Sequence, residues 1–314
     1  MNLTILIPTM NRPHYLLRAL NYLERVGFKG KVLVGDSSDK ETQIPKGNTL
    51  VNYLYLPATD YIHDGACMKR MLEEVDTDYA VMQGDDDFLI PNGLQQCVDF
   101  LEENKDFSAA HGHRINFYLK DNKLDSAHLM ACPEWKQDKP GERWMAYMRN
   151  GLSTQAYVHR TDTWREMYEN VDKIGSRYLG PELLPCSMTA ILGKVRALNC
   201  LTYCMQKDTE NRQVDWKEKS FWAYMTNPEW VNDLNGVMGF LCKTLIQKED
   251  MPLKDAEEFI TREFWLHVSW VLNSHWHNQY SGQKPKLPNH LNDVLRSVKW
   301  EHYSDFRSVD LALQ

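Results

Sequence analysis

The first 120 residues alternate between short apolar runs typical of strands and amphipathic runs typical of helices, and this alternation restricts the fold more than any other feature. The strand-like runs are residues 3–9, 31–36, 50–57, 78–83 and 107–119, and the helix-like runs are residues 13–27, 64–77 and 91–104. Strands that alternate with helices imply a mostly parallel sheet with right-handed crossovers. We therefore predict an α/β fold in which helices flank a mostly parallel sheet.

The composition excludes several classes of protein. The chain has 314 residues, a formal net charge of -7 and no basic block, which argues against a nucleic-acid partner. No stretch approaches the ~20 apolar residues that span a bilayer, and the first residues lack the pattern of a signal peptide. We therefore expect a cytoplasmic location, with the inner face of a membrane as the alternative. The seven cysteines are odd in number and lie in apolar contexts, so we expect reduced, mostly buried thiols.

Polar side chains follow three of the predicted strands at the point where each strand ends. They occupy residues 9–12, 36–39 and 85–87. Parallel sheets bind ligands at the carboxyl ends of their strands, so these side chains are candidates for one site. The last group is three consecutive aspartates, and two carboxylates about 4 Å apart repel by roughly 4 kcal/mol at the dielectric of a protein surface. We therefore expect a positive group beside them. A turn that caps the following helix is the simpler alternative.

Three motifs, taken in the order in which they occur, resemble those of a known protein family. "IPTMNRPHYLLRAL", "VLVGDSS" and "QGDDDFLIP" follow one another in the first 90 residues. In this order they resemble the family 2 glycosyltransferases with a GT-A fold, and the resemblance extends over about the first 205 residues. It implies a Rossmann-like nucleotide-sugar-binding domain, and it implies metal-dependent transfer of a sugar from a nucleoside diphosphate donor to a hydroxyl of a glycan or lipid-linked acceptor.

The resemblance also implies roles for individual residues. The "PTMNRP" loop would line one side of the nucleotide site, and Asp36 would bind the base or the ribose. A basic residue, Lys69 or the adjacent Arg70, would face the donor. Mn²⁺ or Mg²⁺ would be held by Asp87 together with Asp85 or Asp86, because hard divalent cations take oxygen ligands. The nucleotide-binding candidates are Pro8, Thr9, Asn11, Arg12, Asp36, Lys69, Asp85 and Asp86, and the metal-binding candidates are Asp87 and Asp85.

A later segment resembles the part of the family that holds the catalytic base. In "GPELLPCSMTAILGKVRALNC" the usual acidic pair is reduced to Pro181 and Glu182. The resemblance implies that Glu182 deprotonates the acceptor hydroxyl and that the reaction inverts the anomeric centre. A carboxylate favoured at a helix start by the helix dipole is the alternative for Glu182.

The residue pattern and the tryptophan content of the sequence change near residue 215. Helical patterns dominate residues 216–314, which contain seven of the ten tryptophans. We predict a catalytic domain over residues 1–215 and a helical C-terminal region over 216–314. That region would form an acceptor-binding wall, an interface between copies of the chain, or a contact with a membrane surface, and its few basic residues make the last least favoured.

Two other functions compete with glycosyl transfer. Sugar nucleotidyltransferases resemble one another in a glycine-rich, basic loop after the first strand. The corresponding segment here, "IPTMNRP", contains no glycine, which argues against this function. A non-catalytic subunit of glycan assembly could have kept the fold, although retention of the aspartates argues against it.

Overall fold

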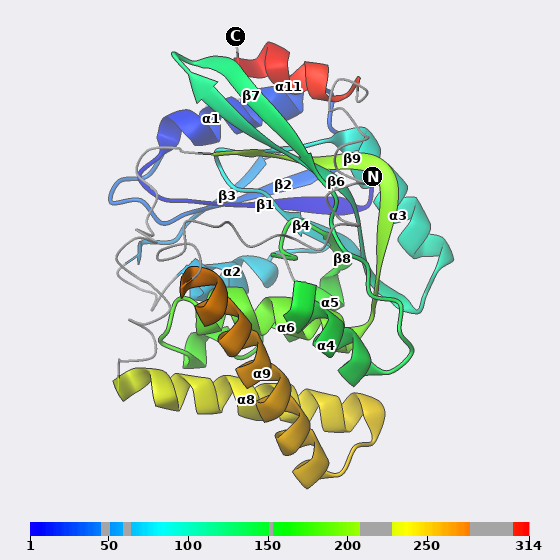
Figure 1. Cartoon of the computed structure of the whole chain (residues 1–314). Coiled ribbons are helices and arrows are strands. Elements are labelled where there is room, and N and C mark those ends of the chain that lie inside the picture. Colours follow the sequence, from blue (N-terminus) through cyan, green and yellow to red (C-terminus); the bar gives the residue numbers. More distant parts are fainter. Residues whose placement is uncertain (45–50, 59–63, 151–152, 208–227, 277–303, 314) are drawn as a thin grey trace.

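In the part of the chain that the structure describes, a nine-stranded mixed sheet forms the centre of the molecule, and helices cover both of its faces (Figure 1). The computed structural model describes residues 1–44, 51–58, 64–150, 153–207, 228–276 and 304–313. The strands are β1 (Leu3–Thr9), β2 (Lys31–Asp36), β3 (Val51–Tyr55), β4 (Tyr79–Met82), β5 (Phe88–Leu89), β6 (Phe107–Lys120), β7 (Lys123–Met130), β8 (Val158–Arg160) and β9 (Lys194–Gln206). The helices are α1 (Pro13–Arg25), α2 (Asp64–Leu72), α3 (Pro91–Glu103), α4 (Pro140–Asn150), α5 (Thr161–Tyr168), α6 (Leu184–Leu192), α8 (Pro228–Glu249), α9 (Leu253–Trp276) and α11 (Phe306–Leu313), with short turns η2 (Val171–Lys173) and η3 (Leu179–Leu183).

The first half of the sheet is parallel, as predicted from the alternating pattern. Strands β3, β2, β1 and β4 lie side by side in that order and all run in the same direction. In the register of β1 and β2, Thr9 lies opposite Asp36, so the polar segments that follow these strands meet at one edge. Strand β1 is buried along almost its whole length, which explains its continuous apolar sequence.

The second half of the sheet is mixed, and its pairing was not evident from the sequence. Strand β8 is antiparallel to both β4 and β6, whereas β6 and β9 are parallel. Strand β5, directly after the aspartates, is antiparallel to β9. The hairpin strand β7 extends from β6 and was not predicted. The long strand β9 therefore lies close to the aspartate turn, although more than 100 residues separate them in the chain.

Helix α1 illustrates how local sequence sets these elements. Pro13 occupies its first turn, where a missing N–H costs nothing, and Leu16, Leu20 and Leu23 repeat at helical spacing and are buried on the sheet. Gly27 follows the helix with a φ of 65°, in the left-handed region that glycine adopts without penalty. The predicted helix over residues 13–27 is thus confirmed to within two residues.

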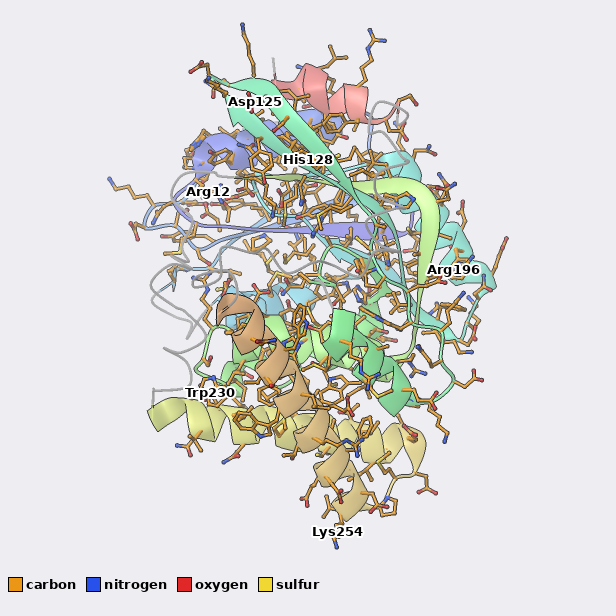
Figure 2. All side chains as sticks on the ribbon, in the orientation of Figure 1. Arg12, Asp125, His128, Arg196, Trp230 and Lys254 are labelled. Carbon is orange, nitrogen blue, oxygen red and sulfur yellow. The ribbon has the colours of Figure 1, made fainter. Side chains whose placement is uncertain are left out.

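The core has two parts, one on each face of the sheet. Side chains of α1, α3 and α11 form the first part with one face of the strands, and side chains of α2, α4, α5, α6, α8 and α9 form the second. Helices α8 and α9 cross each other as an outer layer beyond α4 and α6 (Figure 1). Figure 2 shows Trp230 of α8 in this outer layer, at a distance from Arg12 beside the sheet. Trp230 is almost fully buried, so the outer layer belongs to the same core.

Three further predictions can be compared with the structure. The helix predicted over residues 64–77 ends at Leu72, and residues 73–78 form a connection to β4. All described elements after residue 227 are helices, although α11 packs against α1 on the opposite face of the sheet from α8 and α9. The boundary predicted at residues 215 and 216 lies outside the described residues. The seven cysteines are free thiols and six of them are buried, as expected.

None of the helices in the described part of the chain combines the length and the apolar character needed to cross a bilayer.

Candidate active site

The carboxylate of Asp36 organises the loop that follows β2. It accepts hydrogen bonds from the backbone N–H groups of Ser38 at 2.9 Å and Thr42 at 3.0 Å, and from the hydroxyl of Tyr53 at 2.6 Å. Burial alone would raise the pKa of Asp36, but these hydrogen bonds outweigh it and lower the pKa below its ordinary value. Asp36 is therefore a buried, ionised group at the end of its strand.

The loops after β1 and β2 are joined to each other through Asn11. Its backbone N–H donates to the hydroxyl of Ser38 at 2.7 Å, and its side-chain amide donates to Asp39 at 3.2 Å. Asn11 has a φ of 56°, which asparagine tolerates better than most residues. Pro8 precedes this loop within β1, opposite Gly35 of β2. The predicted nucleotide loop and the loop of Asp36 thus form one hydrogen-bonded edge.

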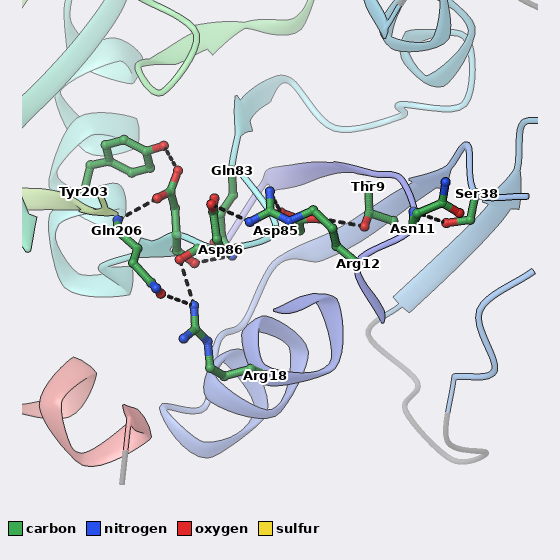
Figure 3. Close-up of polar contacts among 11 residues, drawn as sticks. Thr9, Asn11, Arg12, Arg18, Ser38, Gln83, Asp85, Asp86, Tyr203 and Gln206 are labelled. Carbon is green, nitrogen blue, oxygen red and sulfur yellow. Dashed lines mark hydrogen bonds and ion pairs between the residues drawn. The ribbon is translucent and has the colours of Figure 1, made fainter. Parts of the chain in front are cut away.

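Arg12 provides the positive charge expected beside the three aspartates (Figure 3). Its guanidinium nitrogens lie 2.9 Å from Asp85 and 2.6 Å from Asp86, and the hydroxyl of Thr9 donates to Asp85 at 2.8 Å. All three aspartates are buried. Burial raises the pKa of Asp85 to about 6, although the charge of Arg12 acts in the opposite direction. Part of the repulsion between the carboxylates is therefore relieved within the protein itself.

Asp87 points to a different part of the molecule. Its carboxylate accepts hydrogen bonds from the hydroxyl of Tyr203 and from the backbone N–H of Gln206 at 2.8 Å, both on β9. Arg18 of α1 donates to the side chain of Gln206 at 2.6 Å and to the backbone carbonyl of Asp86 at 2.9 Å. Burial lowers the pKa of Arg18, and the surrounding negative charges oppose that effect. The turn is thus clamped from both β1 and β9.

The structure gathers most of the predicted donor-site residues and adds others. Thr9, Arg12 and the three aspartates form one cluster, whereas the amine of Lys69 contacts Asp172 and the carbonyl of Glu169, both 2.8 Å away. Lys69 is thus bound at the η2 turn. Sequence reasoning missed Arg18, Tyr203 and Gln206. Arg18 belongs to α1, which begins directly after Arg12, but no local signal connects the two β9 residues to the aspartates.

The oxygen ligands of the aspartate turn suit a hard divalent cation only in part. Across the described ranges, no group of three or more histidine, cysteine or acidic side chains converges on one point. A carboxylate oxygen has two lone pairs, so one that accepts a hydrogen bond can also bind a cation. The turn therefore fits a Mg²⁺ or Mn²⁺ ion that takes one or two carboxylates from the protein and its other ligands from a bound diphosphate.

Glu182 lies in the π-helical turn η3 and lines a cavity of about 180 Å³. Such turns occur often at functional sites. The carboxylate makes no hydrogen bond or ion pair within the described part of the chain, and it is only partly buried. Burial raises the pKa of Glu182 to about 7; the charge of Asp64 adds to this effect and that of Arg177 opposes it. Glu182 does not open a regular helix, because α6 begins two residues later.

Gln155 connects the Glu182 turn to the strand that precedes the aspartates. Its side-chain amide donates to the carbonyl of Pro181 at 2.7 Å and to the hydroxyl of Tyr168 at 2.9 Å. Its backbone carbonyl accepts a hydrogen bond from the backbone N–H of Met82, the last residue of β4, at 3.1 Å. Through its bonds to Pro181 and Met82, Gln155 therefore links the turn that contains Glu182 to the strand that precedes the aspartates.

The fold and these two clusters define an α/β protein with a buried polar cluster at the carboxyl ends of its parallel strands. No protein-family model matches the sequence, and no curated protein matches it in sequence. Among solved structures, residues 1–349 of S. aureus TarS in complex with UDP-GlcNAc match with a TM-score of 0.51 and 13% identity, over 89% of this chain and 93% of that chain. The same TarS fragment in complex with UDP matches with a TM-score of 0.48 and 14% identity, over 89% and 93% of the two chains.

TarS is a glycosyltransferase of the GT-A type. The chain therefore has a GT-A-like fold, as the resemblance of its motifs implied. At 13% identity the likeness establishes the fold alone.

Proposed function

We propose that this protein is a glycosyltransferase that moves a sugar from a nucleoside diphosphate donor to a hydroxyl of a glycan or lipid-linked acceptor. One observation carries the proposal. Glu182, an unpaired carboxylate with a pKa of about 7, lines a cavity and is joined through Gln155 to the strand that ends in the aspartates. A general base beside a nucleotide crevice is the arrangement that glycosyl transfer requires.

The donor would lie along the carboxyl ends of β1, β2 and β4. Asp36 presents a buried carboxylate suited to a nucleoside hydroxyl or base N–H, and Asn11 shapes the adjoining loop. The guanidinium of Arg12 lies where a diphosphate would approach the aspartates. The UDP-GlcNAc and UDP complexes of TarS favour a uridine nucleotide as the first donor to test.

A divalent cation is part of this proposal. Bound to Asp87 and Asp85 together with the diphosphate, Mg²⁺ or Mn²⁺ would stabilise the negative charge that develops on the leaving group. Three carboxylates lie beside two guanidinium groups, those of Arg12 and Arg18, and this excess of negative charge favours an additional cation.

Glu182 would act on the acceptor. With a pKa of about 7, it is substantially ionised at neutral pH and still basic enough to take a proton from a hydroxyl as the new bond forms. Attack from the face opposite the leaving diphosphate inverts the anomeric centre. Its contribution would be roughly 10²- to 10⁴-fold in rate.

The first experiment is a thermal-shift panel of nucleoside diphosphates, with and without Mn²⁺, on the wild type and on Asp36→Asn. A ligand at 100 times its Kd stabilises a protein by about 2.7 kcal/mol, which such an assay detects readily. We expect one nucleotide to stabilise the wild type, more strongly with Mn²⁺, and Asp36→Asn to lose most of the shift. If no nucleotide stabilises the wild type, the donor site is wrong.

Transfer itself is tested by nucleotide release from the matching sugar nucleotides. Glu182→Gln should retain the thermal shift with nucleotide and lose transfer to acceptors. Release of pyrophosphate from a sugar phosphate and a nucleoside triphosphate would instead indicate a sugar nucleotidyltransferase. Nucleotide binding without transfer or hydrolysis would indicate a non-catalytic subunit.

A further inference from the structure

The cavity beside Glu182 is built by two distant parts of the chain. Tyr147 of α4, Tyr178 and Glu182 at the η3 turn, and His267 of α9 all line it. Helix α9 belongs to the outer helical layer, so that layer reaches the position where a glycosyl acceptor would bind. Of the three roles considered for the C-terminal region, this placement favours an acceptor-binding wall.

His267 has one defined hydrogen bond. Its Nδ1 lies 2.7 Å from the backbone carbonyl of Met148. A carbonyl can only accept, so Nδ1 carries the proton. Burial lowers the pKa of His267, although the bond to Met148 opposes this shift, and the neutral ring keeps a lone pair on Nε2. Within the described part of the chain, Nε2 has no protein partner.

The lining of the cavity selects for a particular chemistry. Two of the residues that line it have acceptor atoms without a partner in the described part of the chain, Glu182 through its carboxylate and His267 through Nε2, and no described lysine or arginine lines it. Ser153 is also present, and its hydroxyl donates to Gln155 at 3.0 Å. Acceptor atoms need O–H or N–H donors, so a hydroxyl-bearing unit is favoured and a phosphate is disfavoured. The two tyrosine rings supply the apolar surface on which a sugar ring packs.

The size of the cavity limits the unit that it can hold. Its volume of about 180 Å³ is below the ~300 to 1,000 Å³ typical of pockets for drug-sized ligands. One monosaccharide residue or one short polyol unit therefore fits better than a longer segment.

We propose that His267 is a specificity-determining residue of the acceptor site: its Nε2 accepts a hydrogen bond from a second hydroxyl of a neutral sugar or polyol unit whose reacting hydroxyl faces Glu182. This inference rests on the proposed function for the reaction, while binding of the unit to the cavity can be measured separately. It gives α9 a direct part in the site, as one wall of the acceptor pocket.

Binding is tested by ligand-observed saturation-transfer NMR on the full-length chain. The probes are methyl glucosides, methyl N-acetylglucosaminides, ribitol and glycerol, with glycerol 3-phosphate as the anionic counterpart. The variants are His267→Asn, which keeps a donor for the Met148 carbonyl and removes the Nε2 acceptor, and Leu266→Gln, an exposed neighbour on α9 that does not line the cavity. Thermal unfolding of both variants verifies that they fold.

We expect at least one neutral probe to bind the wild type and Leu266→Gln, and His267→Asn to bind it about tenfold more weakly, the loss of one hydrogen bond with an unpaired hydroxyl left behind. Once a donor is identified, the KM for the acceptor should rise by the same factor while the KM for the donor stays unchanged. Equal binding by wild type and His267→Asn, a preference for glycerol 3-phosphate, or no binding of any neutral probe would overturn the inference. If neutral probes bind as expected but no nucleotide stabilises the protein, the proposed function fails and the cavity assignment stands.

Discussion

The side-chain amide of Gln155 lies 2.7 Å from the carbonyl oxygen of Pro181, the residue before Glu182. The backbone carbonyl of Gln155 also accepts a hydrogen bond from Met82, two residues before Gly84 and the aspartates. The position of the candidate base relative to the aspartate turn is thus set by one buried residue. An error of about 1 Å in such a position can reduce a catalysed rate on the order of 100-fold.

Replacement of this residue tests its positioning role. We expect Gln155→Leu to lower kcat at least tenfold, because the π-helical turn loses its anchor, while the KM for the donor and the thermal shift with nucleotide stay unchanged. The cost in unfolding free energy should be about 1–3 kcal/mol, since the Pro181 carbonyl is left without its buried donor. Gln96→Leu, at an exposed position on α3, is the control. A rise in donor KM with unchanged kcat would contradict the positioning role.

The raised pKa of Glu182 makes stability depend on pH. In the folded state this pKa is about 7, against an ordinary value of 4.5, so the folded protein holds a proton that the unfolded chain has lost. Stability from this group is full below pH 4.5 and is lost as the pH rises through 7. Glu182→Gln removes the cost of ionising a buried carboxylate. We expect the free energy of unfolding of this variant to exceed that of the wild type by about 2 kcal/mol at pH 8 and to equal it near pH 4.5.

Denaturant unfolding at both pH values measures this difference. The control is Glu24→Gln, an exposed position on α1. Equal stability of Glu182→Gln and wild type at pH 8 would mean that the carboxylate is not desolvated. The same pKa predicts that transfer activity rises with pH through about 7, because only the ionised carboxylate accepts a proton.

Arg12 should be among the most stability-determining charges of the protein. Arg12→Met leaves Asp85 and Asp86 buried without their guanidinium, and removal of one partner from a buried ion pair costs about 3–5 kcal/mol. The loss should be larger at pH 8 than at pH 5, because protonation of Asp85 relieves the repulsion as the pH falls. Mg²⁺ should stabilise the variant more than the wild type. Arg25→Met, at an exposed position at the end of α1, should cost less than about 1 kcal/mol. Similar losses for the two variants would contradict this account.

Gly84 is required by the aspartate turn for steric reasons. A Cβ atom at this position would lie 2.6 Å from a carboxylate oxygen of Asp87 and 3.1 Å from one of Asp86. The Asp87 carboxylate is held by Tyr203 and Gln206, so it cannot move aside without loss of hydrogen bonds. Gly84→Ala should therefore destabilise the protein by about 1–3 kcal/mol and abolish the Mn²⁺ effect in the thermal shift.

The matched control for this substitution is Gly239→Ala in α8. A Cβ there meets no atom within 4 Å, and alanine is favoured over glycine inside a helix by about 1 kcal/mol. Thermal unfolding of both variants should give shifts of opposite sign. A neutral or stabilising Gly84→Ala would show that the turn is not packed as described.

Much of the parallel sheet and of the polar cluster at its carboxyl edge was evident from the sequence alone. The parallel half of the sheet followed from the alternation of elements, because the apolar spacing of a strand or helix is a local property of the chain. The polar residues at the ends of β1, β2 and β4 could be placed at one edge because parallel strands present their carboxyl ends together. The motif order led to the GT-A fold, and the position of Glu182 as candidate base came from the same resemblance.

Only the tertiary structure decided what each of these groups contacts. The partner of Asp85 and Asp86 is Arg12, which the sequence could place near them but not against them, and the partners of Asp87 lie 116 and 119 residues further along the chain. His267 likewise reaches the carbonyl of Met148 across 119 residues. Such contacts depend on how whole elements pack, and no local periodicity encodes them. The sequence by itself therefore determined which residues could form the site, and the packing of β9 and α9 decided their neighbours, their charge states and the shape of the cavity.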